Sequence, residues 1–227
     1  MIKVDLQQYA NGNWGKNIKT ISEISRFGDE CMVESDGEMY CFDDIVSDIF
    51  PEDSKPASVD GISFEKNAVY LFEFKTGFYD RININNLDAE KAKCDKTGSV
   101  CGEYWRLFGK NRDQEKRMLR DSIRMKAIES YITLEKKIFP KCEKVNGSLS
   151  KIVYWVVIDS EPVNAEEDIL GSLTEKGTPL SNEHEKIRQA LKRFKLQKDE
   201  YGADYYYDEI KVLSASEFKV ICRDRWG

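Results

Sequence analysis

The fold is decided by two neighbouring segments, SVDGISF at residues 58–64 and AVYLFEFK at residues 68–75. Both segments are rich in β-branched and aromatic residues, and the short polar connection between them is typical of a β-hairpin. Successive side chains of a strand point to opposite faces, which separates Val69, Leu71, Glu73 and Lys75 from Tyr70, Phe72 and Phe74. A strand that is apolar on both faces for most of its length is expected inside a sheet.

A helix is expected immediately before this hairpin. Ser35 and Glu38 have the spacing of a capping box, in which two side chains bind backbone amides at the start of a helix. Apolar residues then recur at helical intervals until Pro51. The pattern therefore predicts a first helix over residues 36–50.

Beyond the hairpin, the sequence predicts alternating helices and strands. The expected elements are an amphipathic helix over residues 113–139, a buried strand at the sheet centre over 151–159, a helix after about residue 182, a strand near 204–213 and a short helix after Ser214. Residues 76–111 are polar, contain glycines and are too long for an ordinary connection. We expect them to form an inserted loop or lid within a single α/β domain spanning residues 1–227.

The hairpin also carries residues that suggest a chemical site. Glu73 and Lys75 share one face of their strand and Asp60 belongs to the partner strand, so the three are expected to meet at one end of the sheet. Metal-dependent hydrolysis of a phosphodiester needs carboxylates that converge on the ion and a positive group near the attacking water. The alternative interpretation is a turn aspartate beside a surface ion pair.

With an acid on one strand and E-x-K on the next, SVDGISFEKNAVYLFEFK resembles the core of the PD-(D/E)XK nuclease superfamily. The resemblance implies a restriction-endonuclease-like α-β-β-β-α-β core, whose mixed central sheet is flanked by helices. It assigns Asp60 and Glu73 as ligands of magnesium or manganese, the Phe74 carbonyl as a further ligand, and Lys75 as the group that orients the nucleophilic water. One departure is that Val59, not proline, directly precedes Asp60; Pro56 lies four positions upstream of Asp60.

The same family often adds an acid from the first helix and a basic residue from the helix after E-x-K. Glu38 shares the apolar stripe of the predicted first helix and is the candidate ligand, although a capping-box glutamate needs no further role. Lys116, Arg120 and Arg124 recur every four residues on the later helix. The resemblance suggests that they contact nucleic-acid phosphates, and the alternative is a solvated helix face with acidic neighbours.

Composition and charge indicate where in the cell the protein is expected and how its charges are distributed. Charged residues make up 33% of the chain and no apolar run is long enough for a conventional membrane span. The N-terminus lacks the pattern of a secretory signal and the six cysteines form no CxxC pair, so a cytoplasmic location is expected. The net charge of -6 conceals segregation, because residues 29–53 carry ten carboxylates and no lysine or arginine, whereas residues 110–126 carry seven basic groups.

The leading functional hypothesis is a metal-dependent nuclease that acts on DNA. The chain contains no phosphate-loop or dinucleotide-binding glycine motif, so no nucleotide triphosphate cofactor is expected. The aromatic residues near the apolar strands are interpreted mainly as core, with base stacking as the alternative. Two other hypotheses are a noncatalytic module that binds nucleic acid or protein on the same fold, and a phage or defence-system accessory protein whose acidic residues 29–53 bind a basic partner. A homodimer is possible.

Overall fold

The computed structural model describes residues 6–65, 68–78, 99–142, 151–159, 183–193, 196 and 206–226. A mixed six-stranded sheet contains, in spatial order, β1 (Ile18–Thr20), β4 (Glu38–Cys41), β5 (Gly61–Glu65), β6 (Ala68–Lys75), β7 (Lys151–Ile158) and β8 (Glu209–Ser214). The pairs from β1 to β6 are antiparallel, whereas β6, β7 and β8 run parallel. A separate ribbon pairs β2 (Arg26–Phe27) with β3 (Glu30–Cys31). The predicted α/β class and mixed central sheet are confirmed.

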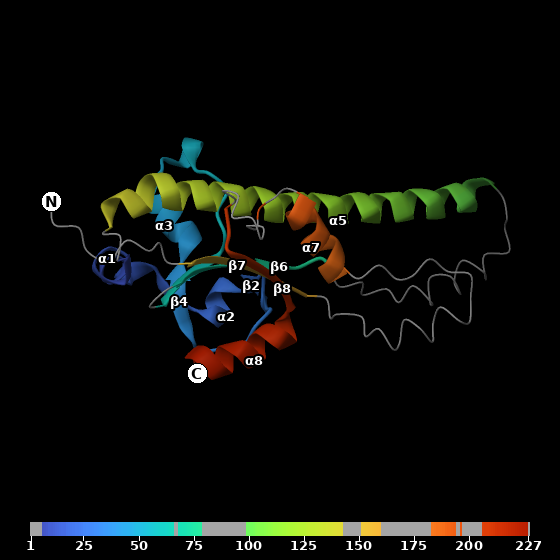
Figure 1. Ribbon diagram of the computed structural model, residues 1–227. Coiled ribbons are helices and arrows are strands. Elements are labelled where there is room, and N and C mark those ends of the chain that lie inside the picture. Colours follow the sequence, from blue (N-terminus) through green and yellow to red (C-terminus); the bar gives the residue numbers. More distant parts are fainter. Residues whose placement is uncertain are drawn as a thin grey trace.

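Helices cover both faces of the sheet. One face carries α1 (Leu6–Asn13), α3 (Phe42–Ile49), α5 (Ser99–Thr133) and α7 (Glu183–Arg193), and the other carries α2 (Ile21–Ile24) and α8 (Ala215–Trp226). The short turns are η1 (Gly15–Asn17), η2 (Glu52–Ser54), η3 (Leu134–Ile138) and η4 (Phe139–Lys141). In Figure 1, α5 lies on the side of the sheet opposite α8 and its N-terminal part extends past the sheet edge. No helix in the described ranges is long and apolar enough to cross a membrane.

Strand β6 is an interior strand with two buried faces. It pairs with β5 on one side and with β7 on the other. Val69 and Leu71 belong to the hydrophobic cluster that contains α5, whereas Tyr70, Phe72 and Phe74 pack in the cluster that contains α8. The predicted alternation is therefore confirmed, and it directs Glu73 toward α5.

The first helix is shorter than predicted. Residues 38–41 form β4, and α3 begins only at Phe42. Glu38 is exposed and pairs with Thr20 in β1, so the expectation of a capping-box glutamate on a helix is wrong. The strand is favoured because β1 and β5 provide partners on both sides, a long-range contribution that local spacing does not reveal. A capping box does occur in α2, where Thr20 accepts a hydrogen bond from the Glu23 amide.

The helix after the hairpin is longer than predicted. It begins at Ser99, so residues 99–111 are its first turns and not part of a loop. These residues look like a loop in sequence because this part of the helix extends past the sheet and needs no continuous apolar stripe. Residues 79–98, the remainder of the predicted lid apart from 76–78, lie outside the described residues. Near the other end, α5 is followed by a π turn and a 3-10 turn that contains Pro140.

The later elements follow the predicted order. Strand β7 matches the predicted buried strand, and α7 and α8 occupy the positions expected for the last two helices. Strand β8 begins at Glu209, after residues 206–208. The core interpretation of the aromatic residues is confirmed for Tyr154, Trp155 and Tyr207, which are buried, whereas Tyr104 on α5 is exposed.

Two buried tyrosines attach α5 to the sheet. The Tyr154 hydroxyl donates a hydrogen bond to the Ile123 carbonyl at 3.2 Å, and the Tyr207 hydroxyl donates to the Ala127 carbonyl at 2.6 Å. Ile123 and Ala127 are themselves fully buried. Because the two carbonyls are one turn apart, the tyrosines fix how far α5 is advanced along its axis and how it is rotated. Lys126 is thereby placed opposite the β5–β6 hairpin.

Candidate active site

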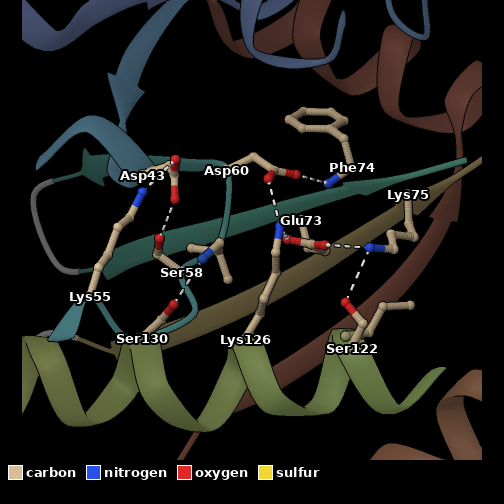
Figure 2. Close-up of polar contacts among 12 residues, drawn as sticks. Asp43, Lys55, Ser58, Asp60, Glu73, Phe74, Lys75, Ser122, Lys126 and Ser130 are labelled. Carbon is tan, nitrogen blue, oxygen red and sulfur yellow. Dashed lines mark hydrogen bonds and ion pairs between the residues drawn. The ribbon is translucent and has the colours of Figure 1, made fainter. Parts of the chain in front are cut away.

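Asp60 is held rigidly at the start of the hairpin. Its amide donates to the Phe72 carbonyl at 3.0 Å, which continues the pairing of β5 with β6 by one residue. Its Oδ2 atom accepts a hydrogen bond from the Phe74 amide at 2.7 Å. The other carboxylate oxygen, Oδ1, therefore faces α5 (Figure 2). Asp60 is a strand-fixed carboxylate with one oxygen engaged by the backbone.

Glu73 lies directly beneath this carboxylate and its side chain has no exposed surface. Its Oε2 atom accepts a hydrogen bond from Lys126 at 2.9 Å, whereas its buried Oε1 atom has no hydrogen-bond partner among the residues that the structure describes. Burial and the nearby charge of Asp60 raise the pKa of Glu73 well above its ordinary value, although Lys126 acts in the opposite direction. A buried carboxylate with one orphaned oxygen is costly, and it is not the surface ion pair that was the alternative interpretation.

Lys126 connects the two carboxylates. Its Nζ atom lies 2.8 Å from Asp60 Oδ1 and 2.9 Å from Glu73 Oε2, and Figure 2 shows the side chain rising from α5 between them. Burial alone would lower the pKa of this ammonium, but the charges of Glu73 and Asp60 outweigh burial and raise it above the ordinary value. Lys126 is therefore a charged group at the centre of the site. In the sequence, Lys126 is noted only as one of the seven basic groups of residues 110–126.

Lys75 lies at the outer edge of the cluster. Its Nζ atom donates to the Ser122 hydroxyl at 3.1 Å and lies 3.9 Å from Glu73 Oε1. The side chain is 22% exposed, so the ammonium is accessible to solvent while its direction is fixed by two neighbours. The three residues predicted to meet, Asp60, Glu73 and Lys75, are thus brought together at one end of the hairpin.

A further acid that the sequence reasoning did not select comes from the first turn of α3. Asp43 Oδ1 accepts a hydrogen bond from Ser58 at 2.5 Å, and Oδ2 accepts one from Lys55 at 2.9 Å. Burial tends to raise the pKa of Asp43, but these hydrogen bonds and the charge of Lys126 together lower it. Asp43 borders the site next to Asp60 (Figure 2) and stabilises the segment that leads into it.

The same segment is bound by α5. Ser130 Oγ accepts a hydrogen bond from the buried Val59 amide at 2.9 Å, and the Glu129 carboxylate accepts one from the Ala57 amide. Ser122, Lys126 and Ser130 follow one another at intervals of four residues, so they lie on one line along the helix. These polar residues lie next to the buried Ile123 and Ala127 on the helix. This four-residue spacing is the pattern in the sequence that could have identified Lys126 as a site residue.

Removal of the Ser130 hydroxyl tests how strongly α5 fixes this segment. We expect Ser130→Ala to lower the free energy of unfolding by about 1–3 kcal/mol, because the Val59 amide is left buried without an acceptor. The measurement is urea denaturation followed by circular dichroism. Ser47→Ala is the matched control, since the Ser47 hydroxyl is exposed and binds only within its own helix. Equal stabilities of the two variants would contradict the prediction.

The remaining predicted residues lie elsewhere. Glu38 is exposed on β4 and forms no part of the cluster. Lys116 and Arg120 point to Glu183 of α7, with Nζ and Nη1 at 3.7 and 2.9 Å from its carboxylate oxygens. Lys116 is buried, and its phosphate contact stays a prediction of the resemblance. Arg124 lies 3.8 Å from Asp121 and is partly exposed on α5.

The cluster offers few oxygen ligands to a hard divalent cation. Within the described part of the chain, no group of three or more His, Cys, Asp and Glu side chains is arranged to hold a metal. Asp60 and Glu73 provide two carboxylates, and the orphaned Glu73 Oε1 atom is the feature that a cation would satisfy. Magnesium is commonly bound by one or two carboxylates with water completing its shell, so these residues match that minimal set. The Phe74 carbonyl stays a predicted ligand.

Comparison with known proteins adds no relative to this description. No protein family, curated protein or solved structure matches the chain.

Proposed function

We propose that the protein is a metal-dependent nuclease that hydrolyses DNA phosphodiester bonds at Asp60, Glu73 and Lys75. The observation that carries the proposal is the convergence of these side chains, with a fully buried Glu73 whose Oε1 atom lacks a hydrogen-bond partner within the described part of the chain. A stable fold gains little from such a group, whereas a site that must bind a cation needs it. A restriction-endonuclease-like core is part of the same proposal.

The arrangement of elements supports that core with one difference. Helix α3, the β5–β6 hairpin, α5 and the parallel strand β7 follow in the order that the resemblance implies. The third antiparallel strand, β4, pairs with β5 but precedes α3 in the chain instead of following it. The difference leaves the acid and the E-x-K residues on adjacent strands, and this adjacency is what the proposed chemistry requires.

Each side chain of the cluster has a distinct role in the proposed reaction. Asp60, fixed by the Phe74 amide, and Glu73, buried beneath it, would hold magnesium or manganese. When bound, the metal supplies Lewis-acid stabilisation of charge on the phosphate. Lys75 is held by Ser122 at the solvent-facing edge, where its ammonium orients the attacking water and stabilises the developing negative charge. Water adds to phosphorus, the bond to the leaving oxygen breaks, and a proton from the water balances that oxygen.

A noncatalytic binding module is a second candidate, and a specific observation favours it. The Lys126 ammonium already bridges both carboxylates and Lys75 lies beside Glu73, so two cations face two acids without a metal. In a binding module this cluster would only stabilise the hairpin against α5. Such a protein would bind DNA or a protein partner without cleaving anything.

The two candidates are separated by a cleavage assay on linear, circular and single-stranded DNA. The protein is incubated with magnesium, with manganese and with a chelator, and Asp60→Asn is assayed in parallel. We expect cleavage that needs metal and is lost in Asp60→Asn. Asp29→Asn, which removes an exposed acid in the turn between β2 and β3, serves as the charge-matched control. DNA binding without cleavage under every condition would favour the noncatalytic module.

A further inference from the structure

The ammonium of Lys126 occupies the place between the carboxylates. Its Nζ atom is within 2.9 Å of one oxygen from Asp60 and one from Glu73. A divalent cation shared by these two carboxylates would have to use Asp60 Oδ1, the oxygen that Lys126 already binds, because Asp60 Oδ2 is engaged by the Phe74 amide. A metal and the Lys126 ammonium therefore compete for Asp60 Oδ1 and for the place between the two carboxylates.

The charges of the cluster lead to the same conclusion. The two ammonium groups of Lys75 and Lys126 equal in number the two acids Asp60 and Glu73, so the cluster holds no excess negative charge before any metal enters. A divalent ion added beside an undisturbed Lys126 would create a strongly positive cluster around a buried carboxylate. Removal of the ammonium from between the carboxylates avoids this repulsion.

We propose that Lys126 is the resident counter-ion of the site and that a divalent metal binds by displacing its ammonium from Asp60 and Glu73. The proposal rests on the proposed function and specifies how its metal is admitted. The Lys126 side chain is 23% exposed and lies on α5, so its flexible stem can carry the ammonium toward solvent while the helix stays in place. Lys126 is thus a positioning residue that lowers the metal affinity of the free protein.

Manganese binding measured by electron paramagnetic resonance tests the displacement directly. Lys126→Met removes the competing charge and is expected to bind manganese at least about tenfold more tightly than the unaltered protein. Lys55→Met is the matched control, because Lys55 pairs with the neighbouring Asp43 and does not touch Asp60 or Glu73. Its manganese affinity is expected to stay close to that of the unaltered protein.

The other outcomes separate this proposal from the proposed function. Equal or weaker binding by Lys126→Met, together with loss of binding in Asp60→Asn, overturns displacement but leaves a metal site at the carboxylates. Absence of manganese binding in all of these proteins overturns displacement and the metal-dependent function together. An equal gain in Lys55→Met also overturns displacement, since general electrostatics would then explain the change.

A second measurement uses the unaltered protein and avoids any loss of folding in Lys126→Met. The amino-group signal of Lys126 is observed by nitrogen-15 nuclear magnetic resonance and assigned by its absence in Lys126→Arg. In the paired state its ammonium protons exchange slowly because two carboxylates bind them. Addition of diamagnetic magnesium is expected to shift or remove this signal with the same midpoint as metal binding. A signal unchanged at saturating magnesium would overturn the proposal.

Discussion

Lys75→Ala is expected to reduce DNA cleavage by about 10²- to 10⁴-fold at saturating magnesium. The Lys75 ammonium lies at the outer edge of the cluster, 3.9 Å from Glu73 Oε1, and its orientation is fixed by Ser122 at 3.1 Å. Its loss removes the group that orients water and stabilises charge in the transition state. Asp60 and Glu73 are left in place, so manganese affinity is expected to be retained.

Single-turnover cleavage with metal and protein in excess measures this effect separately from binding. Lys136→Ala is a suitable control, because this substitution also removes one positive charge. Lys136 is exposed and lies in the π turn after α5, away from Lys75 in the chain. A Lys75→Ala protein that cleaves as fast as the control would exclude Lys75 from the chemistry. Parallel loss of cleavage and manganese binding would assign Lys75 to the structure of the metal site instead.

Glu73→Gln is expected to weaken manganese binding and to stabilise the folded protein at neutral pH. An amide has nearly the shape of the carboxyl group but carries no charge, so metal affinity should fall by more than about tenfold. The same change removes a charge that has no contact with solvent. We expect the free energy of unfolding to rise at pH 7, because the folded state then no longer has to bury this ionisable group.

The sign of the pH dependence follows from the raised pKa of Glu73 in the folded state. Between the ordinary value of 4.5 and the raised value, the folded protein binds more protons than the unfolded chain. The unaltered protein therefore loses the contribution of Glu73 to stability as the pH rises through this interval. Glu73→Gln has no such loss, so its advantage should grow from about pH 4 toward neutral pH.

Urea denaturation at a series of pH values from 4 to 8 measures this difference. Glu65→Gln is the control, because Glu65 lies on the same hairpin but its side chain is 38% exposed and pairs with Arg225 at the surface. A stability difference between Glu73→Gln and the unaltered protein that shrinks with rising pH would contradict the assignment of Glu73 as a buried, destabilising acid.

The hairpin and its chemical residues could be predicted because their signals are local. Alternation along β6 separated Glu73 and Lys75 from the aromatic face, and the short connection placed Asp60 on the neighbouring strand. The structure agrees with the alternation along β6, and it places Asp60 one residue before β5, where the Asp60 amide still bonds the Phe72 carbonyl of β6. Adjacent strands leave little freedom in register once the turn length is fixed, so residues near in sequence determine this part of the site.

The helical side of the site could not be predicted in the same way. Lys126 meets its two carboxylates across 66 and 53 residues of sequence, and Arg120 meets Glu183 across 63. Helical spacing identifies which side chains share a face, but it does not say which face is turned toward the hairpin. The rotation of α5 is set by buried contacts such as those of Tyr154 and Tyr207, which come from β7 and from the segment before β8. The strand β4, predicted as helix, likewise depends on distant partners.

The two halves of the cluster are therefore positioned by different kinds of contact. The two acids are held by hydrogen bonds between neighbouring strands. Ser122 and Lys126 instead lie on α5, whose contacts with the sheet include the Tyr154 and Tyr207 hydroxyls. A slight rotation of α5 would move the Lys126 ammonium relative to Asp60 and Glu73, but it would leave the distance between these two acids unchanged. Substitution of Tyr154 or Tyr207 could therefore change the position of the Lys126 charge in the site, although neither tyrosine belongs to the cluster.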